Sequence, residues 1–477
     1  MNLSDIKFIV FFALIYFLIL IAGFIRKKST KIGVNIYKSL LFAASYVFAI
    51  TWGIESVIYL LALTVFVFII TLLTDKYGIP VIPILGVVVC VSGLAVFKYL
   101  NFVVGSFSLL FSGEYTFINI IAPLGISFYT FSAISYIVDV KNKEYSANNN
   151  FMDVAIYLAY FPKLISGPLM SANDFFEKLN SSRGITFKNT ESGIQLFVIG
   201  LFKKLVLADH LSVFVNDVFN APSAFSSLSV VLAVLAFSFQ LYFDFSGYSD
   251  MAIGLSEMIG IKIDKNFNLP YSSCNLTEFW KRWHISLSAW LQKNIYIPLG
   301  GNRKGEIRTY INLFLVMLIG GLWHGANWTF IIWGALHGFG LIVHKLFRKV
   351  RKNKTKSTNV YIQTLSKIGT FIFVTICWVF FRADSVGDAF LIFKIMFSFK
   401  TGITQIYIWL IFALVVYFLF LAYFKYRSYK LKTKRLNEDF YVLDLSTIKG
   451  LTVFFIVVGL TICMAYFGDV AFIYGKF

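Results

Sequence analysis

The stretch FIVFFALIYFLILIAGF, Phe8–Phe24, indicates the class of fold, because it is apolar over nearly its whole length. A helix needs about 20 such residues to cross the hydrocarbon core of a bilayer. With 58% hydrophobic and only 14% charged residues, the chain is predicted to be an all-α polytopic membrane protein. The other apolar stretches are Ser56–Leu73, Ile82–Phe97, Leu228–Phe243, Phe371–Phe381 with its flanks, Ile403–Phe424 and Leu451–Phe467.

Basic residues indicate how the helices are oriented. The run Arg26–Lys31 follows the first apolar stretch, which ends without a small-residue cleavage site and is therefore not a signal peptide. By the positive-inside tendency this run lies in the cytoplasm, as do Lys345–Lys356 and Lys425–Arg435. One hairpin between the last two runs and one helix after them would place the C-terminus outside. These loops hold much of the formal net charge of +19, which needs no nucleic-acid partner to explain it.

The four cysteines are scattered along the chain, with no CxxC pair and no Cys/His cluster. The sequence therefore predicts neither a disulfide framework nor a metal site, and we expect small apolar core residues at all four positions. They are Cys90, Cys274, Cys377 and Cys463.

Apolar sequence is repeatedly broken by polar residues, glycine and proline in Pro123–Leu169 and again in Gln240–Gly340. Irregular backbone at membrane depth is tolerated only where it is buried in protein or lines a polar cavity. The pattern therefore predicts a multi-helix bundle around a central funnel or tunnel, with short interfacial or re-entrant helices. We expect one integrated membrane domain over residues 1–477, with its motif region at about 123–340.

The segment NLTEFWKRWHISLSAWLQKNIYIPL, Asn275–Leu299, is predicted to be a helix that does not span the membrane, because its lysines and arginine make a full crossing costly. Thr277 is the expected N-cap. In one continuous helix Trp280, His284 and Ser288 are four residues apart and share a face. We expect this helix at the interface or plunging into a cavity.

His324 stands in LIGGLWHGANWTFIIWG, Leu318–Gly334, where glycines let backbone and ligand approach closely and Trp323 and Trp328 are rigid neighbours. A neutral histidine in such a dry site can accept a proton from a hydroxyl that attacks an acyl group. The alternative is a structural histidine bonded to a carbonyl, or one in an interfacial belt. A second histidine in an equally unusual setting, His284, favours catalysis.

Three roles are open to His284: it orients the substrate, stabilises an oxyanion or helps to form the base. The alternative is a histidine that faces lipid headgroups from an interfacial helix. The neighbouring Arg282 either binds a phosphate or carboxylate, or extends its charge to the interface above a buried stem.

The run FQLYFDFSGYSDMAIGL, Phe239–Leu255, places four polar residues around a predicted helix end. A carboxylate there must be paired or hydrated. These residues either line a ligand cavity, or they form a buried structural network or a cap by Ser246 or Asp250 on the following helix, and the sequence favours neither interpretation. They are Asp244, Ser246, Tyr248 and Asp250.

The other histidines are predicted to have no catalytic role. His337 and His344 are seven residues apart, hence on one helical face, and are interpreted as packing or boundary residues. His210 is expected near a helix end.

Several runs together resemble the membrane-bound O-acyltransferase family, in its bacterial alginate and peptidoglycan O-acetyltransferase type. The resemblance covers about Pro123–Gly338, and no generic membrane pattern requires RWHxSLS followed by GLWHG. The matching runs are APLGISFYTFSAISYIVDV, YLAYFPKLISGP, YFDFSGYSDMAIGL, NFNLPYSSCNLTEFWKRWHISLSAWLQKNIYIPLGGNR and GLWHGANWTFIIWGALHG.

The resemblance implies that His324 is the essential catalytic residue and that His284 is the second histidine of the active site. It implies no metal and no bound cofactor. The side chains expected to line the substrate site or tunnel are Asp244, Ser246, Tyr248, Arg282, Trp283, Ser288, Trp323 and Asn327.

The resemblance also implies a reaction at the bacterial cytoplasmic (inner) membrane. An acetyl group is taken from a cytoplasmic donor, with acetyl-CoA expected, and is moved outward for O-acetylation of a cell-surface polysaccharide. Because no serine hydrolase module is evident in the chain, a separate extracytoplasmic acetyltransferase is the expected partner.

The C-terminal residues AFIYGKF, Ala471–Phe477, are similar to the family's terminal tyrosine motif, although Gly475 stands where an aromatic residue is expected. The match makes Tyr474 a candidate covalent acyl relay at the end of a C-terminal helical region, 448–477. The alternative is an ordinary aromatic belt at the end of the last helix.

Two other functions stay open. A related branch of the family moves D-alanine from a carrier protein onto teichoic acid, although YIPLGGNR fits the acetylation type better. A transporter that exports a polysaccharide or acyl group without catalysis is the second alternative.

Overall fold

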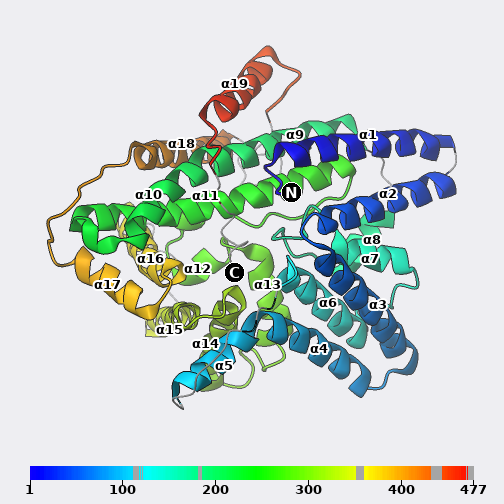
Figure 1. Cartoon of the computed structure of the whole chain (residues 1–477), viewed down its shortest axis with the longest axis horizontal. Coiled ribbons are helices and arrows are strands. Elements are labelled where there is room, and N and C mark those ends of the chain that lie inside the picture. Colours follow the sequence, from blue (N-terminus) through cyan, green and yellow to red (C-terminus); the bar gives the residue numbers. More distant parts are fainter. Residues whose placement is uncertain are drawn as a thin grey trace. The chain divides into compact units, whose positions relative to one another are not determined.

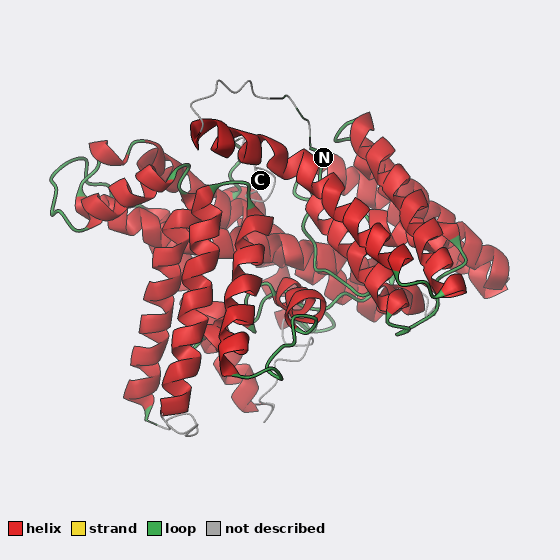
Figure 2. Ribbon diagram, turned by 90° about the horizontal axis from the view of Figure 1, so that it is seen from below, coloured by secondary structure: helices red, strands yellow, loops and turns green. Residues whose placement is uncertain are grey.

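The computed structural model describes residues 1–28, 30–110, 118, 120, 122–180, 185–350, 359–430, 443–468 and 470. Within these ranges the regular elements are helices (Figure 2), and the only β-pairing is an isolated bridge between Phe225 and Ile403. Eight of the described helical segments are long and apolar enough to cross a membrane. The prediction of an all-α polytopic membrane protein is confirmed.

The spans include two long helices in the region predicted to be interrupted throughout, Glu306–His324 and Trp328–Val350. The polar residues at the ends of both helices led to the prediction of an interruption, although each helix has an apolar segment long enough to cross a membrane. The apolar helical parts of the last two stretches, Ile408–Tyr423 and Ile448–Met464, are shorter than these spans. The remaining spans are Ile6–Gly23, Ile32–Ile50, Ile54–Tyr77, Val81–Ser108, Ser227–Ile259 and Val360–Arg382.

The described residues of Met1–Phe197 and Met251–Asp264 pack as one compact unit. In this unit α1 lies along α2 (Figure 1), and a buried ion pair of 2.7 Å between Lys38 Nζ and Asp153 Oδ1 joins α2 to α7. Its helices are α1 (Ile6–Lys28), α2 (Thr30–Ile50), α3 (Ile54–Tyr77), α4 (Val81–Leu94), the π-helix η1 (Ala95–Tyr99), α5 (Leu100–Leu110), α6 (Ile126–Lys141), α7 (Phe151–Ala159), α8 (Ala172–Asn180) and most of α9 (Phe187–Leu201).

The described residues of Val198–Asp250 and Lys265–Phe477 form a second compact unit, which holds both candidate histidines. The prediction of one integrated domain stays a prediction. The helices of this unit are the π-helix η2 (Phe202–Ala208), α10 (Asp209–Asn220), the 3₁₀ turn η3 (Pro222–Ala224), much of α11 (Ser227–Ile259), the 3₁₀ turn η4 (Pro270–Ser272), α12 (Leu276–Trp280), α13 (Ile285–Leu291), the π-helix η5 (Gln292–Tyr296), α14 (Glu306–His324), α15 (Trp328–Val350), α16 (Val360–Arg382), α17 (Val386–Met396), α18 (Ile408–Lys430) and α19 (Ile448–Met464).

The helix α11 is continuous over 33 residues, so the predicted helix end around Asp244 and Asp250 is wrong. A buried carboxylate, Asp244, and a partly exposed one, Asp250, persist within it because η2 supplies counter-ions. Lys204 Nζ lies 2.7 Å from Asp244 Oδ1, and Lys203 Nζ lies 2.5 Å from Asp250 Oδ2. The geometry shows an ionic network for both aspartates, and the interpretation of this run as a cavity wall stays a prediction.

Lys204 also holds a second carboxylate, at 2.8 Å from Asp209 Oδ1. These two residues are five apart in the chain, whereas α-helical neighbours are three or four apart. The π-helical turn provides the difference, because in it the Asp209 N–H donates to the Lys204 carbonyl.

Close contact between α14 and α15 positions the end of α14. The Cβ that would be added at Gly321 meets the Phe330 carbonyl oxygen, and one added at Gly334 lies 2.5 Å from the Met317 carbonyl oxygen. Glycine therefore lets the two backbones approach, which the sequence predicted for the glycines before His324.

Candidate active site

The segment that carries His284 is two short helices rather than one. α12 ends at Trp280, and α13 begins at Ile285. The predicted single helix is therefore wrong, and so is the shared face of Trp280, His284 and Ser288 that depended on it. The conclusion that this segment does not span holds, because neither helix approaches the length of a crossing.

Asn275, rather than the predicted Thr277, caps α12: its side-chain oxygen accepts from the Glu278 N–H at 2.9 Å. Thr277 Oγ1 instead bonds His344 Nδ1 at 2.9 Å. The predicted cap was wrong by two residues because Asn275 and Thr277 both have side chains that can cap a helix.

His284 occupies the junction between the two helices in a left-handed backbone conformation, with φ 43° and ψ 57°. This conformation is uncommon for a residue with a side chain and persists only where the surroundings impose it. Here the main chain of Asn266 imposes it, because its carbonyl accepts the Ile285 N–H at 3.0 Å. The helical bond that this N–H would otherwise make is lost, and the chain turns at His284.

The His284 side chain is fully buried. Its Nδ1 lies 3.3 Å from Asn266 Oδ1, and its ring meets Phe245 edge-on with centroids 4.7 Å apart. Burial lowers the pKa of this imidazole to about 3. His284 is therefore neutral at physiological pH.

His324 is the last residue of α14 and is 3% exposed. Aromatic rings surround it: Trp323 at 4.9 Å, Trp333 at 5.1 Å and Phe381 at 5.2 Å between centroids. Trp328, which the sequence predicts to be a neighbour of His324, is the first residue of α15 and is 54% exposed. Trp333 takes the inward position instead.

Trp323 connects the two histidines. Its ring lies 4.9 Å from that of His324 and 6.0 Å from that of His284, and its own side chain is buried. Two histidines 40 positions apart in the sequence thus share one aromatic neighbour. The structure brings together these three predicted site residues.

The other predicted lining residues are divided between structural contacts and open positions. On α11, Asp244 is paired with Lys204, Ser246 Oγ is buried without a hydrogen-bond partner in the described chain, and the Tyr248 ring is buried. Arg282 is half-buried, and its guanidinium donates to Glu278 Oε1 at 2.8 Å and to Ser272 Oγ at 3.0 Å.

Trp283 is buried within an aromatic cluster, 5.1 Å from Phe267 and 5.0 Å from Trp378 between ring centroids. The Asn327 amide donates to the Asp384 carbonyl at 2.8 Å and its oxygen accepts the Thr329 N–H at 3.0 Å, so it helps begin α15. The roles of both in lining a tunnel stay predictions.

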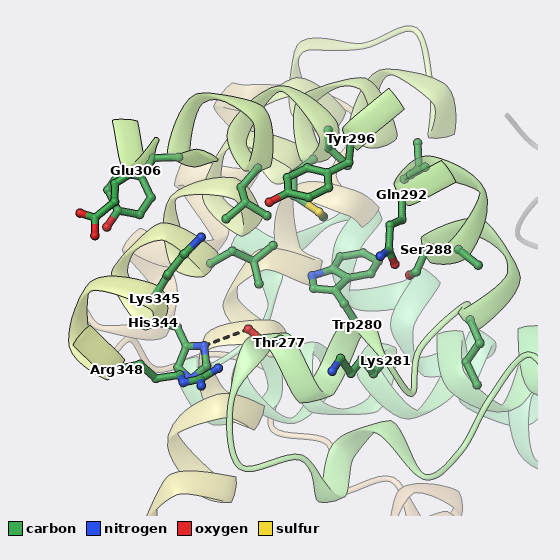
Figure 3. Close-up of a pocket in the computed structure, with 18 of the residues that line it drawn as sticks. Thr277, Trp280, Lys281, Ser288, Gln292, Tyr296, Glu306, His344, Lys345 and Arg348 are labelled. Carbon is green, nitrogen blue, oxygen red and sulfur yellow. Dashed lines mark hydrogen bonds between the residues drawn. The ribbon is translucent and has the colours of Figure 1, made fainter. Parts of the chain in front are cut away.

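Ser288 lines a pocket of about 640 Å³ that forms between α12, α13, α14 and α15 (Figure 3). This volume suits a small-molecule ligand. At one end Lys345 and Arg348 of α15 and Glu306 of α14 lie together, and at the other Trp280 and Ser288 are close (Figure 3).

His344 lines the same pocket, although the sequence assigned it to packing or a boundary. His337 is fully buried between Trp280 and Trp333, as expected for a packing residue. His210 lies in the first turn of α10, near the predicted helix end, with its Nε2 3.0 Å from the Met464 carbonyl oxygen.

Aromatic contacts lead from the pocket to His324. Trp280, which lines the pocket, lies 5.8 Å from Trp333, and Trp333 lies 5.1 Å from His324. Met317 also lines the pocket and precedes His324 by seven residues of α14, a rise of roughly 10 Å. Tyr474, the predicted relay, lies outside the described residues.

Comparison with known proteins decides what this site belongs to. A family model described as MBOAT, membrane-bound O-acyltransferase family, matches residues 140–383, which include both histidines and the pocket. The chain belongs to the membrane-bound O-acyltransferase family. It is an O-acyltransferase and a multi-pass membrane protein.

Individual relatives place the chain within the family. It is 43% identical over 369 residues to a probable alginate O-acetylase of Azotobacter vinelandii, covering 76% of this chain and 72% of the relative. It is 39% identical over 341 residues to the peptidoglycan O-acetyltransferase of Helicobacter pylori, covering 65% and 63%. Identity to the teichoic acid D-alanyltransferase of Streptococcus thermophilus is 28% over 291 residues, covering 57% and 68%.

In the described part of this O-acyltransferase, no three His, Cys, Asp or Glu residues gather as a metal site would require. Asn266 and Phe245, which contact His284, were not singled out from the sequence. Asn266 stands within the matching motif NFNLPYSS, but a polar residue in a loop has no periodicity that would mark it.

Proposed function

We propose that this O-acyltransferase takes acetyl groups from acetyl-CoA and delivers them across the bacterial cytoplasmic membrane for O-acetylation of a cell-surface polysaccharide. The observation that carries the proposal is the pair of buried imidazoles on Trp323, next to a pocket with cationic residues at one end. The names of the more similar relatives, an alginate O-acetylase and a peptidoglycan O-acetyltransferase, support an acetyl group and a polysaccharide acceptor.

The donor is proposed to bind in the 640 Å³ pocket. Lys345 and Arg348 would attract the phosphates of acetyl-CoA, while apolar and aromatic side chains would surround its uncharged arm. The same basic residues belong to a run that the positive-inside tendency assigns to the cytoplasm. The acyl end would then point along α14 toward His324.

The chemical step is proposed to use His324 as the general base. An attacking O–H gives its proton to the imidazole while its oxygen forms a bond to the thioester carbonyl carbon. When the C–S bond breaks, the thiolate leaves and takes the proton back from the imidazolium. The products are an acetyl ester and free CoA thiol, so charge and protons balance.

The attacking hydroxyl is proposed to be the phenol of Tyr474, with the C-terminus on the outer side of the membrane. A phenol has a pKa near 10, so its acetyl ester is a good donor to a sugar hydroxyl. A separate extracytoplasmic acetyltransferase would complete the transfer to the polysaccharide.

The test incubates the purified full-length protein with radiolabelled acetyl-CoA and follows free thiol and protein-bound label. Wild type should release thiol and gain one acetyl group by intact mass spectrometry. His324→Gln should lower both by about 100-fold or more. His210→Gln is the matched control, since glutamine still offers a donor to the Met464 carbonyl.

The remaining outcomes separate the alternatives. Label that persists in Tyr474→Phe rules out the tyrosine relay while leaving acetyl transfer intact. No reaction with acetyl-CoA, but acylation by a D-alanyl carrier protein, would assign the chain to the D-alanyl branch. Polysaccharide export that is unaffected in His324→Gln, without any acyl-enzyme in wild type, would identify a transporter.

A further inference from the structure

Asn266 organises the junction that carries His284. Its side-chain oxygen lies 3.1 Å from the Ser286 nitrogen, 3.0 Å from Ser286 Oγ and 3.3 Å from His284 Nδ1. Its main-chain oxygen accepts the Ile285 N–H at 3.0 Å. Asn266 is 1% exposed, so one buried residue contacts three consecutive residues of the catalytic segment.

These contacts fix which way the Asn266 amide points. A backbone N–H can only donate, so the atom facing the Ser286 nitrogen must be the carbonyl oxygen rather than the amide nitrogen. That oxygen can only accept. Consequently His284 must carry its proton on Nδ1, and in the neutral ring Nε2 then holds a lone pair.

The Nε2 of His284 is buried and has no hydrogen-bond partner among the described residues. The side-chain amide nitrogen of Asn266 is also buried and has no hydrogen-bond partner among the described residues. Buried polar atoms are normally hydrogen-bonded, and an exception at a catalytic residue indicates a group that a substrate satisfies. An unpartnered acceptor on His284 suits an N–H or O–H donor of a bound substrate.

We propose that Asn266 is a positioning residue that holds His284 as the Nδ1–H tautomer, so that Nε2 accepts a hydrogen bond from an N–H or O–H of the bound substrate, while the attacking hydroxyl gives its own proton to His324. The inference rests on the proposed acyl transfer and selects one of the roles that the sequence left open. His284 orients the substrate and does not stabilise an oxyanion, because its Nε2 has no proton to donate.

The groups around His284 bear on its titration. The ring contacts that the described chain shows come from Phe245 on α11, Trp323 on α14 and the Asn266 loop, and none of these side chains is charged. The titratable groups that adjoin these contacting residues in the chain are Asp244, which precedes Phe245 and is paired with Lys204, and His324, which follows Trp323. Burial already favours the neutral ring, and the amide of Asn266 leaves it neutral.

The deciding variant is Asn266→Asp. A carboxylate can accept from Ser286 and His284 in the same geometry, but its charge favours the imidazolium and raises the pKa of His284. The titration of His284, followed by nitrogen-15 NMR of the histidine-labelled protein, should therefore move to higher pH by about 1 unit or more. An unchanged His284 titration in a folded Asn266→Asp protein would overturn the inference.

Asn266→Leu removes the acceptor and should lower kcat by about 10- to 100-fold with little change in KM for acetyl-CoA. Asn268→Leu is the matched control, because Asn268 lies in the same loop and its described contact is a main-chain N–H donated to the Arg282 carbonyl at 2.9 Å. A kcat loss in Asn268→Leu equal to that in Asn266→Leu would assign the effect to loop structure and contradict the inference.

A spectroscopic readout is independent of turnover. Nitrogen-15 NMR of the histidine-labelled full-length protein, with His284→Asn to assign the signal, should show an unprotonated Nε2 and a protonated Nδ1. The opposite tautomer overturns the inference even if the enzyme is active. If wild type shows this tautomer but never releases thiol from acetyl-CoA, the proposed function fails and the positioning by Asn266 stands.

Discussion

Gly321 of α14 lies so close to Phe330 of α15 that a methyl group on its Cα would collide with the Phe330 carbonyl oxygen. A main-chain atom cannot rotate away as a side chain can. Gly321→Ala should therefore separate the two helices near His324 and destabilise the protein by about 1–3 kcal/mol. The measurement is thermal unfolding of the purified protein in detergent, together with thiol release from acetyl-CoA.

The control for this change is Gly369→Ala on α16, where an added Cβ meets no atom within 4 Å. Its unfolding temperature should equal or exceed that of wild type, since alanine favours a helix over glycine. Equal behaviour of the two variants would contradict the importance of the close backbone approach.

Lys204 is the counter-ion of two buried carboxylates, Asp209 and Asp244. Lys204→Met should cost about 3–5 kcal/mol of stability, because it leaves charge buried without compensation. The matched change at an exposed pair is Lys349→Met, which breaks the contact with Glu306 and should leave the unfolding temperature unchanged. A similar loss in both variants would argue against the buried network.

Acid should destabilise the protein through His284. The folded state keeps this imidazole neutral down to about pH 3, whereas the unfolded chain binds a proton near pH 6.5. Below pH 6.5 the unfolded state therefore takes up more protons, and stability falls by about 2 kcal/mol between pH 6.5 and 5.

The check is to compare unfolding at these two pH values in wild type and in His284→Asn. Asparagine tolerates the left-handed conformation at this position better than most residues. The variant should lose less stability on acidification, and an identical loss would assign the acid sensitivity to other groups.

The basic end of the pocket should determine donor affinity. Replacing Lys345 and Arg348 with serine should raise KM for acetyl-CoA about tenfold or more and leave kcat nearly unchanged, because they follow Trp333, the His324 neighbour, by roughly 18 Å or more along α15. Added salt should raise the wild-type KM in the same direction. Lys394→Ser, on the exposed side of α17, is the charge-matched control. A fall in kcat without a change in KM would contradict donor binding there.

Much of the fold follows from local sequence. Spans such as Phe8–Phe24 are recognisable because each buries its own backbone bonds and needs only apolar side chains. The predicted helix end near Asp244 failed because the counter-ion, Lys204, is 40 residues earlier in the chain. Polar residues within an apolar helix look like an interruption until their partners are known.

The histidines were recognisable by composition, but their surroundings were not. The turn at His284 depends on Asn266, because the Asn266 carbonyl accepts a hydrogen bond from the Ile285 N–H that a continuous helix would use internally. Such a contact leaves no periodic pattern in the sequence from which it could be predicted. The error at Trp328 has a similar origin, since only the approach of α14 to α15 decides that Trp333 faces His324.

The π-helical turn η2 has a consequence for which mutations the chain can accept. In an α-helix, residues five apart lie about 140° from each other around the axis, so the contact of Lys204 with Asp209 requires the wider turn. Loss of a single residue between them would restore the regular helix and leave the two charges four apart, where α-helical side chains also meet. In Phe202–Ala208, therefore, we expect a deletion of one codon to be accepted more readily than one between Asp244 and Asp250 of α11, which would turn one carboxylate about 100° away from its lysine.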